Sequence, residues 1–272
     1  MRRRRTARGS TAPLTARGTT MSDVEYAAWL DAHTWAPSAA SGLAVQSDLS
    51  PAAWLLPRLV PDSFDVNMTS PQGYDAYARI LFPFVGPGTR AGDTLGPTEH
   101  VSWQMLAKRN GRAFHPLVEE ETVNAGPDAD DLDVSRSLAS EQVDALLPVL
   151  ARHTASSSGW FLLWDGYGNL RRSVFDGLET VVHPMRNYYL FRGPLAAFGE
   201  FPEGPDYCWP DDFSWCLSGD TDFVWAYLAG SEECVDEVLT LPVLDAVRTE
   251  PTNPARFGMD LINPRPGTHE PG

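Results

Sequence analysis

Apolar residues recur at helical spacing in the first half of the chain and predict short helices there. Residues 22–33 open with Ser22 and Glu25, an S-x-x-E pattern that caps a helix N-terminus. Further helices are expected at three places that carry a capping or proline signal: after Ser50-Pro51, at 99–109 and at 140–151. An apolar run at 77–85 predicts one strand, with Pro83 restricting its end to a sheet edge or a bulge.

The second half of the chain changes to the pattern of strands. Residues 160–164 are apolar at every position, which is typical of a central strand covered on both faces. Residues 185–191 predict another strand, and 213–228 predict a hairpin. Ser231, followed by two glutamates, predicts the N-cap of a last helix.

The predicted hairpin carries two aromatic rows whose relative orientation depends on its loop. Alternating residues share one face of each strand: Phe213, Trp215 and Leu217 on the first, and Phe223, Trp225 and Tyr227 on the second. A loop at 219–221, with an odd number of residues, would pair Trp215 with Trp225 and place both rows on one side. An even loop would place them on opposite sides. We predict the odd register.

These patterns predict an α+β fold, with a mainly antiparallel sheet in the C-terminal half and helices packed on one side or end. The shift in composition after a polar segment at 153–159 favours an internal boundary there, although one continuous core is equally compatible. Four parts are expected: a disordered basic extension at 1–20, a helix-rich part with at least one strand at 21–155, an aromatic sheet with a C-terminal helix at 156–250, and an irregular tail at 251–272.

Charge limits the classes of partner. The 272 residues have a formal net charge of −15, although six arginines and no acid lie among the first twenty. So acidic a body repels a phosphate backbone, and we expect no nucleic-acid partner. No apolar run approaches the roughly 18 to 20 residues that cross a bilayer, so no membrane association is expected.

Cysteine and histidine content argues against disulfides and metals. The three cysteines form no C-x-x-C pair, which indicates reduced thiols and a cytoplasmic location. The six histidines show no ligand spacing, so no metal site is expected. No motif indicates a cofactor: the glycine-rich segment at 86–92 lacks a phosphate-loop lysine, and the acidic segment at 128–133 lacks the glycine of a calcium loop.

Aromatic residues are concentrated late in the chain. Seventeen of the 29 fall between Trp160 and Tyr227, together with ten carboxylates. We expect a non-catalytic binding or regulatory module that uses this block. Its candidate site combines rings with nearby carboxylates: Tyr188, Trp209, Asp211, Asp212, Trp215, Asp220, Asp222 and Trp225. Such a site suits a basic protein, which the module would neutralise, or a small ligand. The competing interpretation is that the rings fill the core.

The alternative hypothesis is an enzyme with aspartates in an aromatic cleft, for example a metal-assisted hydrolase. Asp220 and Asp222 would share one face of a strand and could bind a metal or divide acid and base roles. Aspartate also favours turns for backbone reasons alone. His183 is a possible base without an evident partner. Common hydrolase, zinc-protease and kinase motifs do not occur, so the catalytic residues stay unassigned.

Three segments of the C-terminal part resemble segments that recur in uncharacterised bacterial cytosolic proteins. They are Trp164-Asp-Gly, Tyr188-Tyr-Leu-Phe-Arg-Gly193, and a longer stretch with Trp209-Pro-Asp, Trp215-Cys, Asp220-Thr-Asp222 and Tyr227-Leu-Ala-Gly-Ser231. The resemblance implies a shared α+β fold and assigns no activity, cofactor or catalytic residue.

Overall fold

The computed structural model describes residues 22–86, 100–125 and 132–265. The predicted basic extension and most of the 86–92 and 128–133 segments lie outside these residues. The chain divides into two compact units, one formed by residues up to Ala36 with Gly168–Gly177 and the other by the remaining residues. In the described ranges, no helix has the length and apolar character needed to cross a membrane.

Among its described residues, the smaller unit contains two helices. Helix α1 (Asp23–His33) confirms the N-terminal helix predicted from the capping pattern, and α5 (Arg172–Phe175) is a single turn. A bridge joins Trp35 to Leu170, and the Trp35 ring stacks on Phe175 with centroids 6.0 Å apart. These contacts connect the two chain segments that form the unit.

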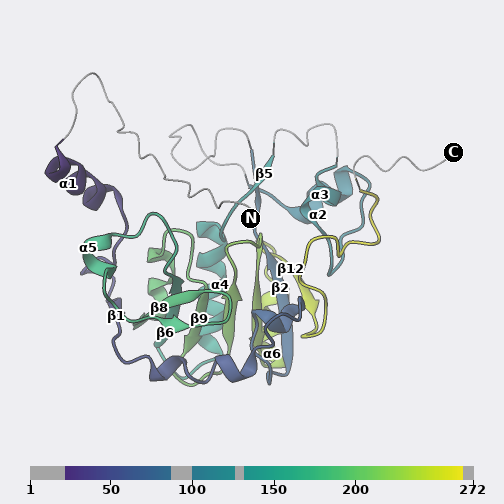
Figure 1. The fold of residues 1–272 in the computed structure, drawn as a ribbon. Coiled ribbons are helices and arrows are strands. Elements are labelled where there is room, and N and C mark those ends of the chain that lie inside the picture. The colour runs from purple at the N-terminus through teal and green to yellow at the C-terminus, as the bar shows by residue number, and fades with distance from the viewer. Residues whose placement is uncertain (1–21, 87–99, 126–131, 266–272) are drawn as a thin grey trace, which may run out of the picture. The chain divides into compact units, whose positions relative to one another are not determined.

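The larger unit is built on a nine-stranded sheet with the order β1-β8-β6-β9-β10-β11-β2-β12, and β7 pairs with β8 (Figure 1). Every strand pair in it is antiparallel. Its strands are β1 (Ala44–Val45), β2 (Ala76–Leu81), β6 (Ser158–Trp164), β7 (Val181–Val182), β8 (Asn187–Pro194), β9 (Tyr207–Pro210), β10 (Cys216–Gly219), β11 (Trp225–Gly230) and β12 (Asp245–Thr249). The predicted α+β class is confirmed.

Strand β2 lies inside this sheet. Ile80 has Ala226 of β11 on one side and Ala246 of β12 on the other, and all six residues of β2 are buried. The strand expected in the N-terminal half is therefore an inner strand of this sheet, and the hydrophobic clusters combine residues from both sides of the expected boundary at 155/156. Strand β2 is paired on both sides, so it is not an edge strand. Pro83 lies beyond its last residue, Leu81, and takes no part in the pairing.

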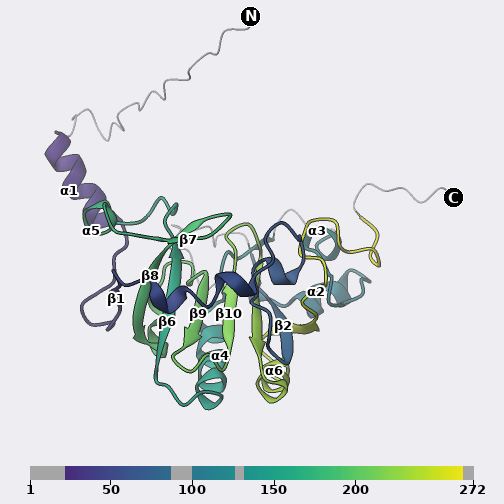
Figure 2. The ribbon, with the colours of Figure 1, turned by 60° about the horizontal axis from the view of Figure 1, so that its bottom comes forward.

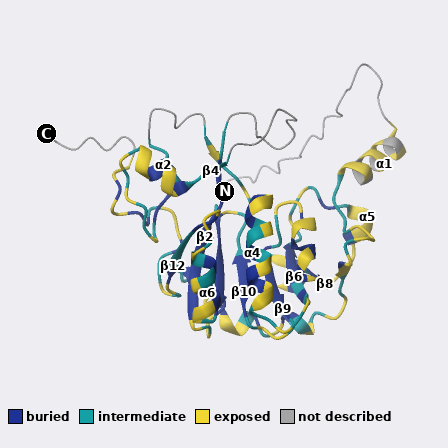
Figure 3. Ribbon diagram, turned by 180° about the vertical axis from the view of Figure 1, so that it is seen from behind, coloured by how far each residue is buried: buried dark blue, intermediate teal, exposed yellow. Residues whose placement is uncertain are grey.

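Helices α4 (Ser140–Arg152) and α6 (Glu232–Leu239) lie on one face of the sheet, with their outward sides exposed (Figures 2 and 3). The Trp215 indole N–H donates to Leu150 O of α4 at 2.9 Å. Ser231 caps α6 as predicted, since its hydroxyl accepts from Cys234 N–H. Helix α4 begins at the predicted Ser140, although Ala139 occupies the N-cap position.

The opposite face is covered by an irregular segment with three 3-10 turns: η1 (Ser50–Ala52), η2 (Leu56–Arg58) and η3 (Val66–Met68). Leu55 and Leu59 pack against Leu162, Leu190 and Trp209 of the sheet. The α-helix predicted after Ser50 is only the short turn η1, because prolines interrupt the segment that follows.

Smaller elements adjoin the sheet. A second sheet has the order β4-β3-β5, and two helices lie near it: β3 (Phe84–Val85), β4 (His100–Val101), α2 (Trp103–Arg109), α3 (Glu120–Val123) and β5 (Asp133–Val134). Helix α2 starts later than predicted, with Ser102 as its N-cap. The segment from 251 to 265 is irregular as predicted, yet Ala255 and Met259 pack into the core.

The hairpin register differs from the prediction. Gly219 lies opposite Ala226 and Leu217 opposite Leu228, so an even number of residues separates the paired positions. Trp215 and Leu217 therefore lie on the opposite face from Trp225 and Tyr227, while Phe213 lies outside β10 and its ring meets Trp54 edge-on. The turn is longer than expected because it is built around Asp220, whose carboxylate accepts from Asp222 N–H at 2.9 Å and whose carbonyl accepts from Phe223 N–H.

Candidate functional site

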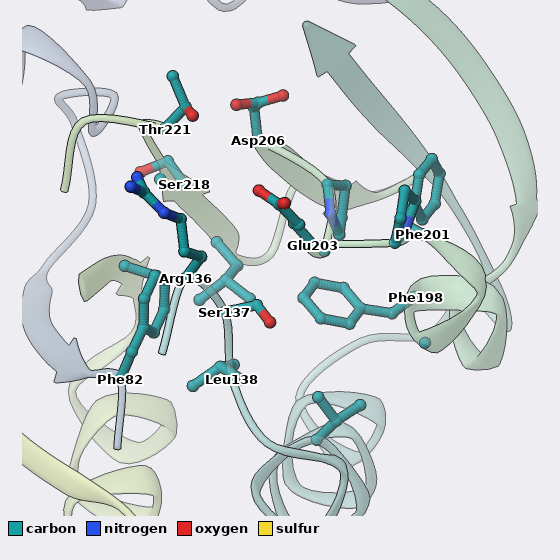
Figure 4. A pocket seen from close by; sticks show the side chains of 18 of the residues that line it. Phe82, Arg136, Ser137, Leu138, Phe198, Phe201, Glu203, Asp206, Ser218 and Thr221 are labelled. Atoms are coloured by element: carbon teal, nitrogen blue, oxygen red, sulfur yellow. The ribbon is translucent and has the colours of Figure 1, made fainter. Parts of the chain in front are cut away.

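A pocket of about 410 Å³ opens on the sheet face that α4 covers (Figure 4). Leu217 of β10 and Ala226 of β11 contribute the sheet side of its lining. The first turns of α4, the 3-10 helix η5 (Leu195–Glu200) and the loop from η5 to β9 form its walls. All these residues belong to the larger unit.

The loop that enters β9 is shaped by glycine and proline. Gly204 has a φ of 76°, in the left-handed region that favours glycine, and Pro202 and Pro205 flank it. The loop rejoins the sheet at Asp206, whose N–H donates to Leu162 O and whose carbonyl accepts from Gly219 N–H. Backbone bonds thus hold Asp206 between two neighbouring parts of the sheet.

The Asp206 carboxyl group is buried at the wall of this pocket, with the residue 4% exposed. It accepts hydrogen bonds from Trp164 N–H at 2.7 Å and from the Tyr167 hydroxyl at 3.4 Å. Burial raises the pKa of Asp206 to about 7; the charge of Asp220 acts in the same direction, while the Trp164 hydrogen bond opposes it. Near neutral pH the group therefore exists in both protonation states.

Asp220 also borders the pocket, but its charge is paired. Arg186 donates to it from Nε at 3.1 Å and from Nη2 at 2.8 Å. The Arg186 guanidinium lies over the Trp164 ring, with Cζ 4.6 Å from the centroid. Side-chain exposure is 12% for Arg186 and 7% for Asp220, so water screens this ion pair only weakly.

Tyr167 links the aromatic wall to the buried acid. Its ring meets Trp164 edge-on, with centroids 5.3 Å apart. Burial, together with the charge of Asp206, raises the pKa of Tyr167 well above its ordinary value. The phenol therefore stays protonated and acts as a hydrogen-bond donor to Asp206.

Two oppositely charged side chains reach the pocket from different segments, Arg136 from the segment before α4 and Glu203 from the loop before β9 (Figure 4). Within the described ranges, neither makes a hydrogen bond or a salt bridge, and both residues are exposed. The charge of Arg136 acts on Glu120 at longer range. Asp144, on the second turn of α4, adds another exposed carboxylate to the lining.

The four rings that the sequence suggested as a recognition surface are buried. Exposure is 0% for Trp209 and Trp215, 2% for Tyr188 and 3% for Trp225. A folded partner cannot contact such rings, so the interpretation of a ring-lined outer surface is corrected: these rings fill the core. Trp225 also stacks against a buried guanidinium, with Cζ of Arg79 3.9 Å from its centroid.

The predicted carboxylates are divided among separate local networks. Asp211 pairs with Arg192 at 2.8 Å, and Asp212 accepts from the Thr154 hydroxyl at 2.8 and 2.9 Å. Asp222, whose side chain is 72% exposed, pairs with Arg186 at 2.6 Å. Of the eight residues predicted from the sequence, only Asp220 borders the pocket.

Sequence reasoning passed over Asp206, Glu203 and Arg136. Asp206 follows Gly-Pro directly before a strand, which is a weak indication of a carboxyl group at the end of a sheet. Its burial depends on segments distant in sequence, which no local pattern reveals. Arg136 has no motif around it at all.

His183, the possible base, lies outside the pocket lining. It is 6% exposed, its Nδ1 accepts from Met185 N–H at 3.2 Å, and its ring packs edge-on against Tyr188. Burial lowers the pKa of His183. These contacts give it a structural role in the core.

In the described part of the chain, no three His, Cys, Asp or Glu residues are grouped so that they could hold a metal ion. Comparison of the chain with protein-family models, with curated proteins and with solved structures found no match. The site is therefore argued from its own geometry.

Proposed function

We propose that this protein is a binding module that takes a small molecule into the pocket beside Asp206. The supporting observation is the pocket itself, because its volume of about 410 Å³ lies within the range of roughly 300–1,000 Å³ typical of small-molecule sites. The lining combines apolar side chains such as Phe198 and Leu217 with charged ones, among them Arg136 and Glu203, and such polar groups orient a ligand in small-molecule sites.

A small ligand fits these observations better than a basic protein. The basic partner predicted from the sequence needs an exposed aromatic surface, and the four candidate rings are buried. A concave site that encloses its ligand needs no such surface. Binding there would be reversible, and the module would act through the liganded state.

An enzyme is the second candidate, and the observation that favours it is the Asp206 carboxyl, whose pKa of about 7 suits a general acid or base. The Asp206→Asn variant separates the two functions. It keeps an acceptor for Trp164 N–H and removes the titrating proton. An enzyme that uses Asp206 as its acid or base would lose turnover of a bound compound in this variant, whereas a binding module would turn over no bound compound in either protein.

Filling the pocket tests the proposal directly. A Cβ placed on Gly199, which lines the pocket, meets no atom within 4 Å, so Gly199→Leu is expected to fold and to occupy the cavity. Ala196→Leu is the matched control, because Ala196 is exposed on the same 3-10 helix outside the lining.

Thermal unfolding is measured with a library of soluble amino acids, amines, carboxylic acids, sugars and nucleosides. We expect a ligand that raises the Tm of the wild type and Ala196→Leu by about 2–4 °C and leaves Gly199→Leu unchanged. An equal shift in all three proteins, or no shift with any compound, would contradict binding in the pocket.

A further inference from the structure

Resting on the proposed small-molecule function, we infer that the pocket selects a zwitterion with an apolar body, whose carboxylate meets Arg136 and whose ammonium meets the carboxyl groups of the opposite wall. The simplest members of this class are α-amino acids with apolar side chains. The inference comes from the charges that remain after the internal ion pairs of the pocket are assigned.

Part of the charge around the pocket is already compensated by ion pairs within the protein. Arg186 engages Asp220 through both of its carboxylate oxygens and also pairs with Asp222. Asp220 therefore has little remaining attraction for a ligand cation. The charged side chains of the lining that keep free hydrogen-bonding capacity within the described ranges are Arg136, Asp144 and Glu203.

The backbone around Arg136 is held in place by hydrogen bonds of its two neighbours. Strand β5 pairs with β3, and the next residue, Ser135, donates its N–H to Pro83 O at 2.9 Å. The Ser135 hydroxyl also donates to Ser137 O at 2.9 Å. These bonds hold the backbone on both sides of Arg136, so its guanidinium is presented from a fixed segment and can bind a carboxylate through two parallel N–H donors.

The wall formed by the loop before β9 is acidic. Glu203 and Asp206 belong to one loop, and Figure 4 shows both on a different side of the pocket from Arg136. Asp206 contributes hydrogen-bond acceptors in either protonation state, and Glu203 contributes a full charge. An ammonium group, with three donors and one positive charge, satisfies such a wall.

Apolar side chains line the space between the two walls. Phe82, Phe198, Phe201 and Leu217 line it, and each is at most 8% exposed. Apolar atoms of a ligand gain from burial there, by roughly 25 cal/mol for each Å² removed from water. A ligand with only one of the two charges would leave either Arg136 or Glu203 without a partner.

The test uses three matched sets of compounds, each with a zwitterion, the amine that lacks its carboxylate and the acid that lacks its ammonium. The sets are alanine, ethylamine and propionate; leucine, isoamylamine and 4-methylpentanoate; and phenylalanine, phenethylamine and 3-phenylpropionate. Affinities of the full chain are measured by calorimetry. In at least one set, the zwitterion is expected to bind more tightly than the amine and the acid of that set, by about tenfold or more.

Variants assign each end of the ligand. Arg136→Met is expected to remove the preference for the zwitterion over the amine. Glu203→Gln is expected to remove the preference for the zwitterion over the acid. Arg256→Met and Glu179→Gln are matched controls, because both residues are exposed and lie outside the lining. The controls are expected to bind like the wild type.

Each other outcome overturns the inference. If the amine or the acid binds as tightly as its zwitterion in every set, one of the two charged contacts is not made, while pocket binding itself stands. If no compound of the three sets binds, the zwitterion class is wrong. The wider library with Gly199→Leu then decides separately whether the pocket binds any small molecule.

Discussion

Arg186 holds Asp220 through two hydrogen bonds, Nε to Oδ2 at 3.1 Å and Nη2 to Oδ1 at 2.8 Å. The pair lies between the Trp164 ring and the pocket, where water reaches it only weakly. Asp206 accepts hydrogen bonds from Trp164 N–H and from the Tyr167 hydroxyl. Because burial raises its pKa to about 7, this carboxyl group of the lining changes its protonation near neutral pH.

Breaking this pair is expected to lower stability. Asp220→Asn leaves the largely buried guanidinium of Arg186 without its main counter-charge, and we expect a loss of about 2–4 kcal/mol in the free energy of unfolding. Urea denaturation of the wild type and the variant measures it. Asp222→Asn is the control, because Asp222 bonds the same arginine with a side-chain exposure of 72% and should cost less than about 1 kcal/mol. Equal losses in both variants would contradict the importance of burial.

Asp206 predicts a pH-dependent stability. Because folding raises its pKa to about 7 from an unfolded value near 4, the folded protein keeps a proton over this interval that the unfolded chain has lost. The stabilisation from Asp206 is fully present at low pH and is lost as pH rises to about 7, by on the order of a few kcal/mol. Asp206→Asn lacks this titration.

The difference in unfolding free energy between Asp206→Asn and the wild type is therefore expected to shift in favour of the variant between about pH 4 and pH 7, and to level off above. Urea unfolding at several pH values measures this difference, in which the effects of other titrating groups cancel. Parallel pH profiles for the two proteins would show that the pKa of Asp206 is not raised.

Gly159 is expected to tolerate no side chain. A Cβ there would lie 2.5 Å from Cδ2 of Leu195 and 2.7 Å from the carbonyl oxygen of Trp209, on the strand that pairs with it. Gly159→Ala should destabilise the protein by about 1–3 kcal/mol. Gly199→Ala, whose Cβ has open space, is the control and should stay within about 1 kcal/mol of the wild type. Chemical denaturation compares them.

The Ser231 cap can be tested in the same way. Ser231→Ala removes the acceptor for Cys234 N–H at the start of α6 and should cost about 1 kcal/mol. Ser231→Thr retains a hydroxyl acceptor and should recover most of that loss. If alanine and threonine behave alike in thermal unfolding, the hydroxyl does not stabilise the helix.

Local signals were sufficient for several elements. The S-x-x-E pattern at Ser22, the serine before α6 and the apolar run that became β6 each predicted an element that the structure contains. These features depend on residues close in sequence. The α+β class followed from the same patterns.

Long-range pairing was beyond local patterns. The hairpin register was wrong because Asp220 builds a longer turn, and the inner position of β2 depends on strands far along the chain. The candidate site shared only Asp220 with the pocket. The carboxyl of Asp206 is buried by tertiary packing, and alternation cannot distinguish a ring in the core, such as Trp215, from one on the surface.

The position of β2 also affects the order of events during synthesis. Its residues leave the ribosome long before the strands that flank it, because Ile80 pairs with Ala226 and Ala246, which are synthesised much later. A nascent chain that has not yet reached Thr249 displays an apolar strand with unsatisfied edges, the feature that invites self-association and chaperone capture.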